Sequence, residues 1–329
     1  MSESAIPFAS VFVAAPTPFD DGGAVDDAAL IHITDYLARR DVAGIALLTE
    51  AAEDAVLTAE ERTKIVERVH KRLAEKKSTI VSISAVSTRE AVDLARHAEQ
   101  CGTHGILLAL HRIPGLGYRE LYRHLDRVSR AVTVPTYLSL RSDNAADCLT
   151  PEELATLGQH ERLAGVFVPD APAEKTRAWA KRMKAKEGTV FAGCALTFPE
   201  AARSGANAVI CGVAMLATEQ STRMMGAVER GDVDMIRRLE KKLKPGIEVL
   251  GPPRPPGEEG GVKRLANRLA QRPLDGLLLR PTVPFRLIKK GLQMQGHPVK
   301  PHVRPPFEEV GNEEAERFKT VLRSSGIVS

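Results

Sequence analysis

The feature that most constrains this chain is an alternation of short apolar segments with amphipathic ones, repeated eight times. Apolar segments followed at short distances by helical patterns are typical of parallel sheets that are covered on both faces. Eight such pairs within about 230 residues favour a closed (β/α)8 barrel over an open sheet, and such barrels keep their chemistry at the carboxyl ends of the strands. The predicted strands are Val11–Ala15, Gly44–Leu48, Thr79–Ser84, Gly105–Ala109, Val134–Leu138, the stretch Glu161–Asp170 around Val166–Val168, Thr189–Ala192 and Ala208–Cys211.

Three of the predicted helices begin with the spacing of a capping box, in which a hydroxyl residue is followed three positions later by a glutamate. The pairs are Thr58 with Glu61, Ser87 with Glu90, and Thr150 with Glu153. We therefore expect helices to begin at these three points.

The predicted division of the chain is a barrel over residues 1–230 and a helical extension over 231–329. Four helical segments are expected in the extension, at Asp232–Val249, Val262–Gln271, Val283–Gln295 and Glu313–Arg323. Between the first two lies Gly251–Gly261, whose proline and glycine content excludes helix and strand and predicts an exposed loop.

Composition argues against several classes of function. The net charge is +4, but lysine and arginine alternate with acidic residues along the helices, and only 4% of residues are aromatic. This pattern is typical of solvated helix faces rather than of a nucleic-acid interface. The four cysteines form no C-x-x-C pair, no secretory signal is recognisable, and no apolar run approaches the roughly 20 residues that span a bilayer. We expect no nucleic-acid or membrane partner and a cytoplasmic location.

A series of short motifs occurs in a consistent order along the chain. Over about residues 8–310 this series resembles the dihydrodipicolinate synthase / N-acetylneuraminate lyase family of class I aldolases. The resemblance implies a (β/α)8 barrel with a C-terminal helical extension, assembled as a homodimer or homotetramer. The motifs are Thr17–Asp20 with Gly23 and Val25–Asp26, Val42–Ile45, Leu57–Arg62, Ser87–Ala91, Leu121–His124, Val134–Pro135, Leu163–Val166 and Gly205–Ile210.

The resemblance also implies a mechanism, and the chain departs from it at three places. Family members attack pyruvate or a related 2-oxo acid with a lysine at the end of strand six, and the matching residue here is Phe167, which has no amine. The family's proton-relaying tyrosine is matched by Ser139, whose hydroxyl is a poorer acid. The Gly-Thr-Thr-Gly-Glu loop that holds the substrate carboxylate is matched by 49–53, where only Glu53 is retained.

Other polar residues follow the predicted strands and could together form a pocket. Its arginines could hold a carboxylate or phosphate, while Glu53 and His111 are acid–base candidates. Alternatively, the arginines form ion pairs with Glu50, Glu53 and Asp170. These pairs would then fill the mouth of the barrel, at the carboxyl ends of the strands, and leave no room for a substrate. No metal-ligand spacing and no cofactor motif is present, so neither is expected. The candidate residues are Thr17, Glu50, Glu53, His111, Arg112, Ser139, Arg141, Phe167, Asp170 and Cys194.

Three hypotheses follow. The first is a barrel that has lost aldolase chemistry and binds a small ligand, such as a carboxylate or 2-oxo acid, or a partner. The second is a lyase or hydratase that acts on such an acid by acid–base chemistry without an imine. The third is a Schiff-base aldolase with a displaced lysine, for which Lys289 and Lys290 are candidates. Lys175 is nearer to Phe167 in sequence, but it falls inside a helical pattern and is expected to be a solvated helix residue.

Overall fold

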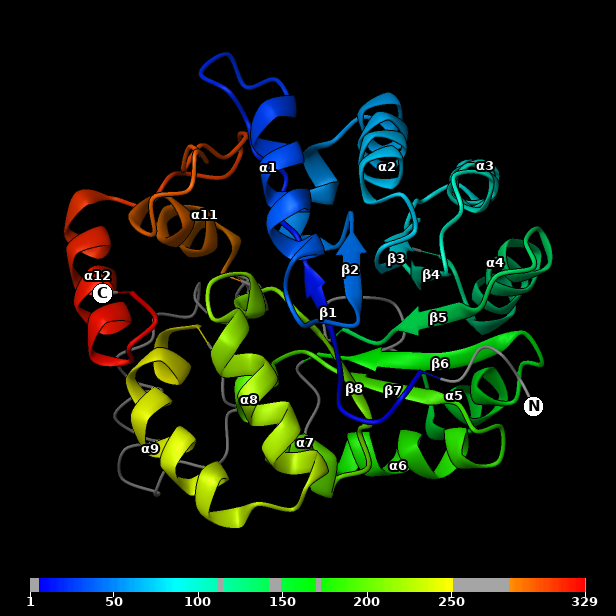
Figure 1. Cartoon of the computed structure of the whole chain (residues 1–329). Coiled ribbons are helices and arrows are strands. Elements are labelled where there is room, and N and C mark those ends of the chain that lie inside the picture. The colour runs from blue at the N-terminus through cyan, green and yellow to red at the C-terminus, as the bar shows by residue number, and fades with distance from the viewer. Residues whose placement is uncertain (1–5, 112–114, 142–148, 170–172, 251–283, 329) are drawn as a thin grey trace, which may run out of the picture.

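The structure is a computed structural model, and it describes residues 6–111, 115–141, 149–169, 173–250 and 284–328. Eight parallel strands pair in chain order and close between β1 and β8, which confirms the predicted barrel (Figure 1). The strands are β1 Ser10–Ala14, β2 Gly44–Leu47, β3 Ser78–Ser82, β4 Gly105–Ala109, β5 Thr136–Ser139, β6 Leu163–Val168, β7 Thr189–Ala192 and β8 Ala208–Cys211.

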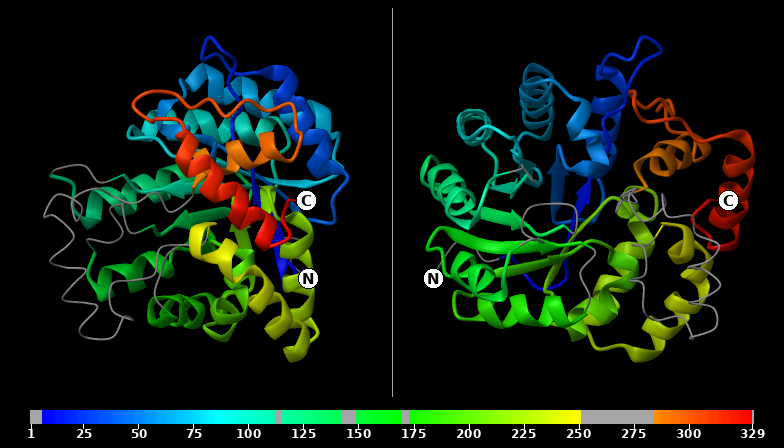
Figure 2. Two further views of the ribbon diagram at one scale, coloured as in Figure 1. Left: turned by 90° about the vertical axis from the view of Figure 1, so that its left-hand side faces the viewer. Right: turned by 180° about the vertical axis from the view of Figure 1, so that it is seen from behind.

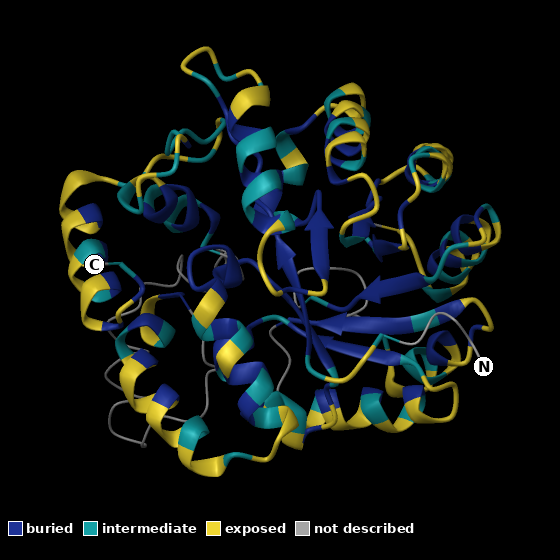
Figure 3. Cartoon of the chain, viewed as in Figure 1, coloured by how far each residue is buried: buried dark blue, intermediate teal, exposed yellow. Residues whose placement is uncertain are grey.

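Helices surround the strands and show their buried faces to them, while their outer faces are exposed (Figure 3). The barrel helices are α1 Asp27–Ala38, α2 Ala59–Leu73, α3 Thr88–Gln100, α4 Tyr118–Arg130, α5 Pro151–Gly158, α6 Ala173–Lys184, α7 Phe198–Arg203 and α8 Thr218–Glu229. Thr58 and Thr150 cap α2 and α5 as predicted, with both hydrogen bonds of the capping box formed.

The capping box predicted at Ser87 is wrong. Ser87 does precede α3, but its side chain makes no capping hydrogen bond. Its backbone ψ is 129°, whereas Thr58 and Thr150 have ψ of 159° and 160°. The spacing of a capping box does not by itself ensure that the side chain bonds to the first turn.

Two apolar clusters show which way the strand residues face. The smaller cluster draws at least one residue from each of the eight strands and therefore fills the barrel interior. The larger cluster holds the residues that alternate with these, together with the inner faces of the helices. The interior cluster contains Phe12, Ala14, Ala46, Ala51, Ile80, Leu107, Tyr137, Phe167, Phe191, Ala208 and Ile210.

Three further helices, α9 Val233–Leu250, α11 Phe285–Met294 and α12 Asn312–Ser324, lie together beside the barrel (Figures 1 and 2). Helix α9 packs on α8, α12 packs on both α9 and α11, and α11 contacts the loop after β2. The extension thus reaches the end of the barrel where the strands terminate. The predicted loop at 251–261 and helix at 262–271 lie outside the described residues. No helix in the described part of the chain is both long and apolar enough to cross a membrane.

Candidate functional site

The inner wall of the barrel places Phe167 beside Ser139. Strand pairing puts Ala109 next to Ser139, Ser139 next to Phe167, and Phe167 next to Phe191. The side chain of Phe167 belongs to the interior cluster, and the residue is only 4% exposed. The position that β6 presents inward at this level is therefore occupied by a buried phenyl ring.

Aromatic rings fill the interior beneath and around this position. Phe191 lies edge-to-face against Phe12, with ring centroids 5.9 Å apart, and against Tyr137, at 5.1 Å. Such perpendicular contacts are favourable beyond the area they bury. Burial raises the pKa of Tyr137 to about 12, so its hydroxyl stays protonated at neutral pH.

The loop after β2 contributes charge to the mouth. It forms two short 3-10 turns, η1 Glu50–Ala52 and η2 Asp54–Val56, joined by Glu53 in the left-handed conformation. The Glu50 carboxylate forms an ion pair with the Arg141 guanidinium, which follows β5. Their side chains are only 13% and 24% exposed, so this pair is shielded from most of the solvent.

Asp54 is a titratable residue of this loop that the sequence analysis did not identify. Burial raises the pKa of its carboxyl, and the nearby charges of Arg62, Arg141 and His111 only partly oppose that rise. Arg62 is itself buried and donates hydrogen bonds to the carbonyl oxygens of Ser84, at 2.9 Å, and Ser82, at 3.2 Å. The Asp54 carboxyl thus has a raised pKa and lies close enough to His111 and Arg141 for their charges to act on it.

Glu53 has a different environment from the one predicted. Its carboxylate pairs with Lys289 of α11, and its second oxygen accepts the backbone N–H of Arg304 at 3.2 Å. Both side chains of the Glu53–Lys289 pair are fully buried. Burial raises the pKa of Glu53 and lowers that of Lys289 to about 8, since each loses solvation of its charge.

Lys289 is further enclosed on its other sides. Its ammonium donates to the carbonyl oxygen of His302 at 2.8 Å and lies 4.2 Å from the centroid of the Phe19 ring. Arg304 lies over the same ring and forms a two-pronged ion pair with Glu61, at 2.5 and 2.8 Å. This network joins the C-terminal extension to the loop after β2.

The remaining candidates lie on other elements. Thr17 is buried after β1, and His111 is partly exposed after β4. Cys194 packs in the outer apolar cluster rather than in the barrel interior. Lys175 lies on α6. Arg112 and Asp170 lie outside the described residues.

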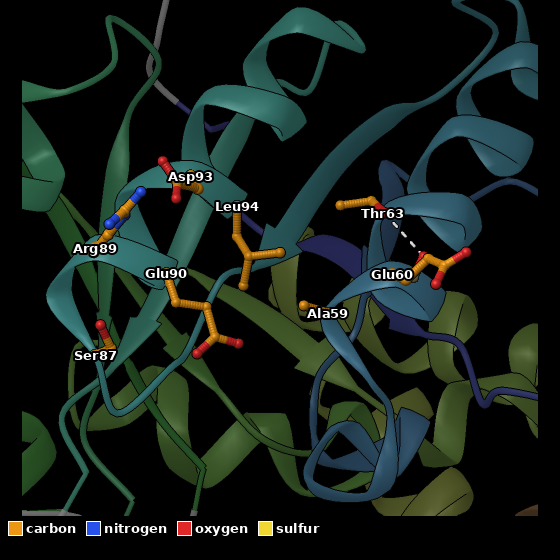
Figure 4. A pocket seen from close by; sticks show the side chains of 8 residues that line it. All are labelled: Ala59, Glu60, Thr63, Ser87, Arg89, Glu90, Asp93 and Leu94. Atoms are coloured by element: carbon orange, nitrogen blue, oxygen red, sulfur yellow. Dashed lines mark hydrogen bonds between the residues drawn. The ribbon is translucent and has the colours of Figure 1, made fainter.

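A hollow of about 510 Å³ lies away from this inner wall, between the N-terminal halves of α2 and α3 (Figure 4). Its charged lining residues are Glu60, Arg89, Glu90 and Asp93, and Glu60 is already paired with Lys64. Within the described residues, no cluster of three or more histidine, cysteine, aspartate or glutamate side chains could hold a metal ion.

Comparison with known proteins places this fold and site in context. The 4-hydroxy-tetrahydrodipicolinate synthase of Pelobacter propionicus is 28% identical over 236 residues, which cover 72% of this chain and 81% of that protein. A probable 2-dehydro-3-deoxy-D-pentonate aldolase of Escherichia coli is 24% identical over 327 residues, or 98% of each chain.

Solved structures agree in fold. A prophage protein of the dihydrodipicolinic acid synthase family from Escherichia coli K12, determined in complex with pyruvate, superposes with a TM-score of 0.79 at 21% identity, covering 97% of this chain and 98% of that one. A putative dihydrodipicolinate synthetase from Pseudomonas aeruginosa gives 0.79 at 20% identity, covering 97% and 99%. A family model described as the dihydrodipicolinate synthetase family matches residues 7–251. This chain therefore belongs to the dihydrodipicolinate synthetase family.

Proposed function

We propose that this family member does not form a Schiff base on strand β6 and instead binds a small carboxylate at the barrel mouth without aldolase chemistry. One observation carries the proposal: the inward position of β6 beside Ser139 holds the buried phenyl ring of Phe167. By the resemblance to the family, this is the position of the imine-forming lysine. A phenyl ring has neither a nucleophile nor a proton to offer.

Arg141 is the residue proposed to receive the ligand. Its guanidinium already binds one carboxylate, that of Glu50, in a partly buried setting at the mouth. Arginine recognises carboxylates through parallel N–H donors, and a shielded site strengthens such contacts. The related Escherichia coli structure in complex with pyruvate supports a 2-oxo acid as the class of ligand.

A specific observation supports a second candidate function, acid–base catalysis without an imine. The pKa of Asp54 is raised by burial, and His111 and Arg141 lie close enough to influence it. A carboxyl whose pKa is raised above its usual value is better suited to moving a proton next to a carboxylate bound by arginine. Exchange of the C3 protons of pyruvate in D₂O, followed by proton NMR, separates the two functions. Exchange that is lost in Asp54→Asn favours catalysis. No exchange with the unmodified protein favours binding alone.

Replacing Glu50 with Gln is expected to tighten pyruvate binding about tenfold, which corresponds to about 1.4 kcal/mol. The glutamate competes for Arg141 and repels an incoming anion, whereas the amide removes the charge and keeps the side-chain size. Titration calorimetry measures the effect. Arg141→Met is expected to abolish binding, and Glu60→Gln on the outer face serves as the charge-matched control. Unchanged or weaker binding by Glu50→Gln would contradict the role of Arg141.

Three further features are proposed from the sequence and its family resemblance rather than from the geometry. We expect a homodimer or homotetramer, a cytoplasmic location, and a functional division into the barrel (1–230) and the helical extension (231–329). The mass of the particle in solution at micromolar concentration tests the first of these, and a monomeric mass would contradict it.

A further inference from the structure

Two cysteines face each other across the seam between β7 and β8. The register pairs Ala192 with Val209. Cys211 ends β8 and Cys194 lies two residues beyond the end of β7, and both side chains pack in the outer apolar cluster. Neighbouring strands lie about 4.8 Å apart, which is within the range of Cα separations, about 4.4–6.8 Å, that a disulfide can bridge.

Backbone N–H groups surround both sulfur atoms. The Cys211 sulfur accepts hydrogen bonds from the N–H of Ala195, at 3.4 Å, and from the N–H of Ala214, at 3.3 Å. Ala195 is the residue after Cys194, so the contact itself brings the two cysteines together. The short turns η4 Ala195–Thr197 and η5 Val213–Met215 supply these donors.

The pKa values of the two thiols are shifted in opposite directions. The Cys211 thiol hydrogen bonds to the Cys194 sulfur, and the backbone N–H groups of Leu196 and Thr197 point to the same atom. These donors lower the pKa of Cys194 to about 7, while the pKa of Cys211 is raised. A thiolate beside a protonated thiol is the arrangement from which thiol–disulfide chemistry proceeds.

We infer that Cys194 and Cys211 are a redox-active pair that a small hydroperoxide converts to a reversible disulfide across the β7–β8 seam. The Cys194 thiolate attacks one peroxide oxygen, the O–O bond breaks, and hydroxide leaves, so that the sulfur is oxidised to a sulfenic acid. The Cys211 thiol then attacks that sulfur, and the S–S bond forms as the sulfenic oxygen leaves as water. One hydroperoxide is reduced for each disulfide formed, and an external dithiol reverses the change.

Burial determines which oxidants can act on the pair. The two cysteines are only 3% and 0% exposed, so a molecule the size of hydrogen peroxide is expected to reach them and a bulky aromatic disulfide is not. Cys101 differs, because it is partly exposed and its pKa is raised by burial and by Glu67.

The location gives the cross-link a structural consequence. The β7–β8 seam has two paired residues on each strand, whereas every other seam of the barrel has three or four. A disulfide between Cys194 and Cys211 would cross-link β7 and β8, which have the fewest paired residues, at the carboxyl ends of the strands. The oxidised protein is therefore expected to unfold at a higher temperature than the reduced protein.

The test uses the full chain carrying Cys101→Ser and Cys148→Ser, so that only the pair remains. After hydrogen peroxide treatment of the folded protein, we expect the intact mass to fall by two hydrogens and a non-reducing digest to contain the linked peptides. Dithiothreitol is expected to restore both the mass and the original melting temperature. In Cys211→Ala, oxidation is expected to stop at a sulfenic acid on Cys194, which dimedone traps when the protein is unfolded in its presence.

The matched control keeps Cys101 and Cys148 and carries Cys194→Ala with Cys211→Ala. Peroxide is expected to leave its melting temperature unchanged. Should the single variant fail to fold, the mass of the pair-only protein decides the question. Recovery of two alkylatable thiols after peroxide treatment would overturn the inference, as would accumulation of sulfinic acid on Cys194 while Cys211 is present.

Discussion

Replacing Lys289 with Met is expected to lower the free energy of unfolding by about 3–5 kcal/mol, because the change leaves a buried carboxylate without its charged partner. The Glu53 carboxylate would retain only the backbone N–H of Arg304 among the hydrogen bonds described for it. Denaturant titration monitored by circular dichroism measures the loss. Since this pair joins α11 to the loop after β2, the extension is expected to loosen first in hydrogen exchange.

Two variants serve as controls for this prediction. Lys290→Met changes the adjacent residue of the same helix, which is partly exposed, and is expected to alter stability by no more than about 0.5 kcal/mol. Lys289→Met combined with Glu53→Gln removes the unpaired charge and is expected to recover part of the loss. Equal effects of Lys289→Met and Lys290→Met would contradict the importance of the buried pair.

The loss in free energy of unfolding caused by Lys289→Met is also expected to depend on pH. Burial already raises the pKa of Glu53, and Lys289 opposes that rise, so its removal raises the pKa further. A carboxyl whose pKa is higher in the folded state binds more protons there, and it loses its contribution to stability as pH rises through that folded pKa. The deficit should therefore be smaller at about pH 5 than at about pH 8.

A Phe167→Lys variant is expected to form a pyruvate imine at most weakly, despite having an amine at the family position. Its neighbour across the β5–β6 pairing is Ser139, which is a poor proton relay, and the Glu50 carboxylate lies near the mouth where a substrate carboxylate would bind. Burial would also lower the pKa of the new amine, which favours nucleophilic attack but destabilises the fold.

Combining Phe167→Lys with Ser139→Tyr and a Gly-Thr-Thr-Gly graft over 49–52 is expected to raise trapping roughly tenfold over the single variant, a change of about 1.4 kcal/mol. Phe167→Met in the same background controls for loss of the ring. Borohydride reduction followed by intact mass measures the adduct. Equally strong trapping by Phe167→Lys alone would show that imine formation needs neither the tyrosine nor the Gly-Thr-Thr-Gly loop, and it would contradict this prediction.

The barrel could be predicted from the sequence because its determinants are local. When apolar strands alternate with helices and the connections are short, few folds can cover both faces of the sheet, and the closed barrel is one of them. The position of Phe167 on β6 followed from that pattern. The capping boxes at Thr58 and Thr150 are equally local, whereas the same spacing at Ser87 forms no capping hydrogen bond.

The charged residues were harder to predict because their partners are distant in the chain. Glu53 and Lys289 are separated by 236 positions, and nothing in the local pattern of either residue indicates the other. Lys289 was a candidate for a displaced nucleophile, and the structure places its amine in a buried ion pair. Asp54 was missed because its raised pKa comes from burial and from residues on other elements, including Arg62 and Arg141.

The most direct test of the central claim is borohydride reduction of the unmodified protein with pyruvate, followed by intact mass spectrometry. With Phe167 on β6 and Lys289 held against Glu53, we expect the mass to remain that of the unmodified chain at saturating pyruvate. A stable adduct equal in mass to a reduced pyruvate imine would contradict the account, and peptide mapping would then identify the lysine that forms it.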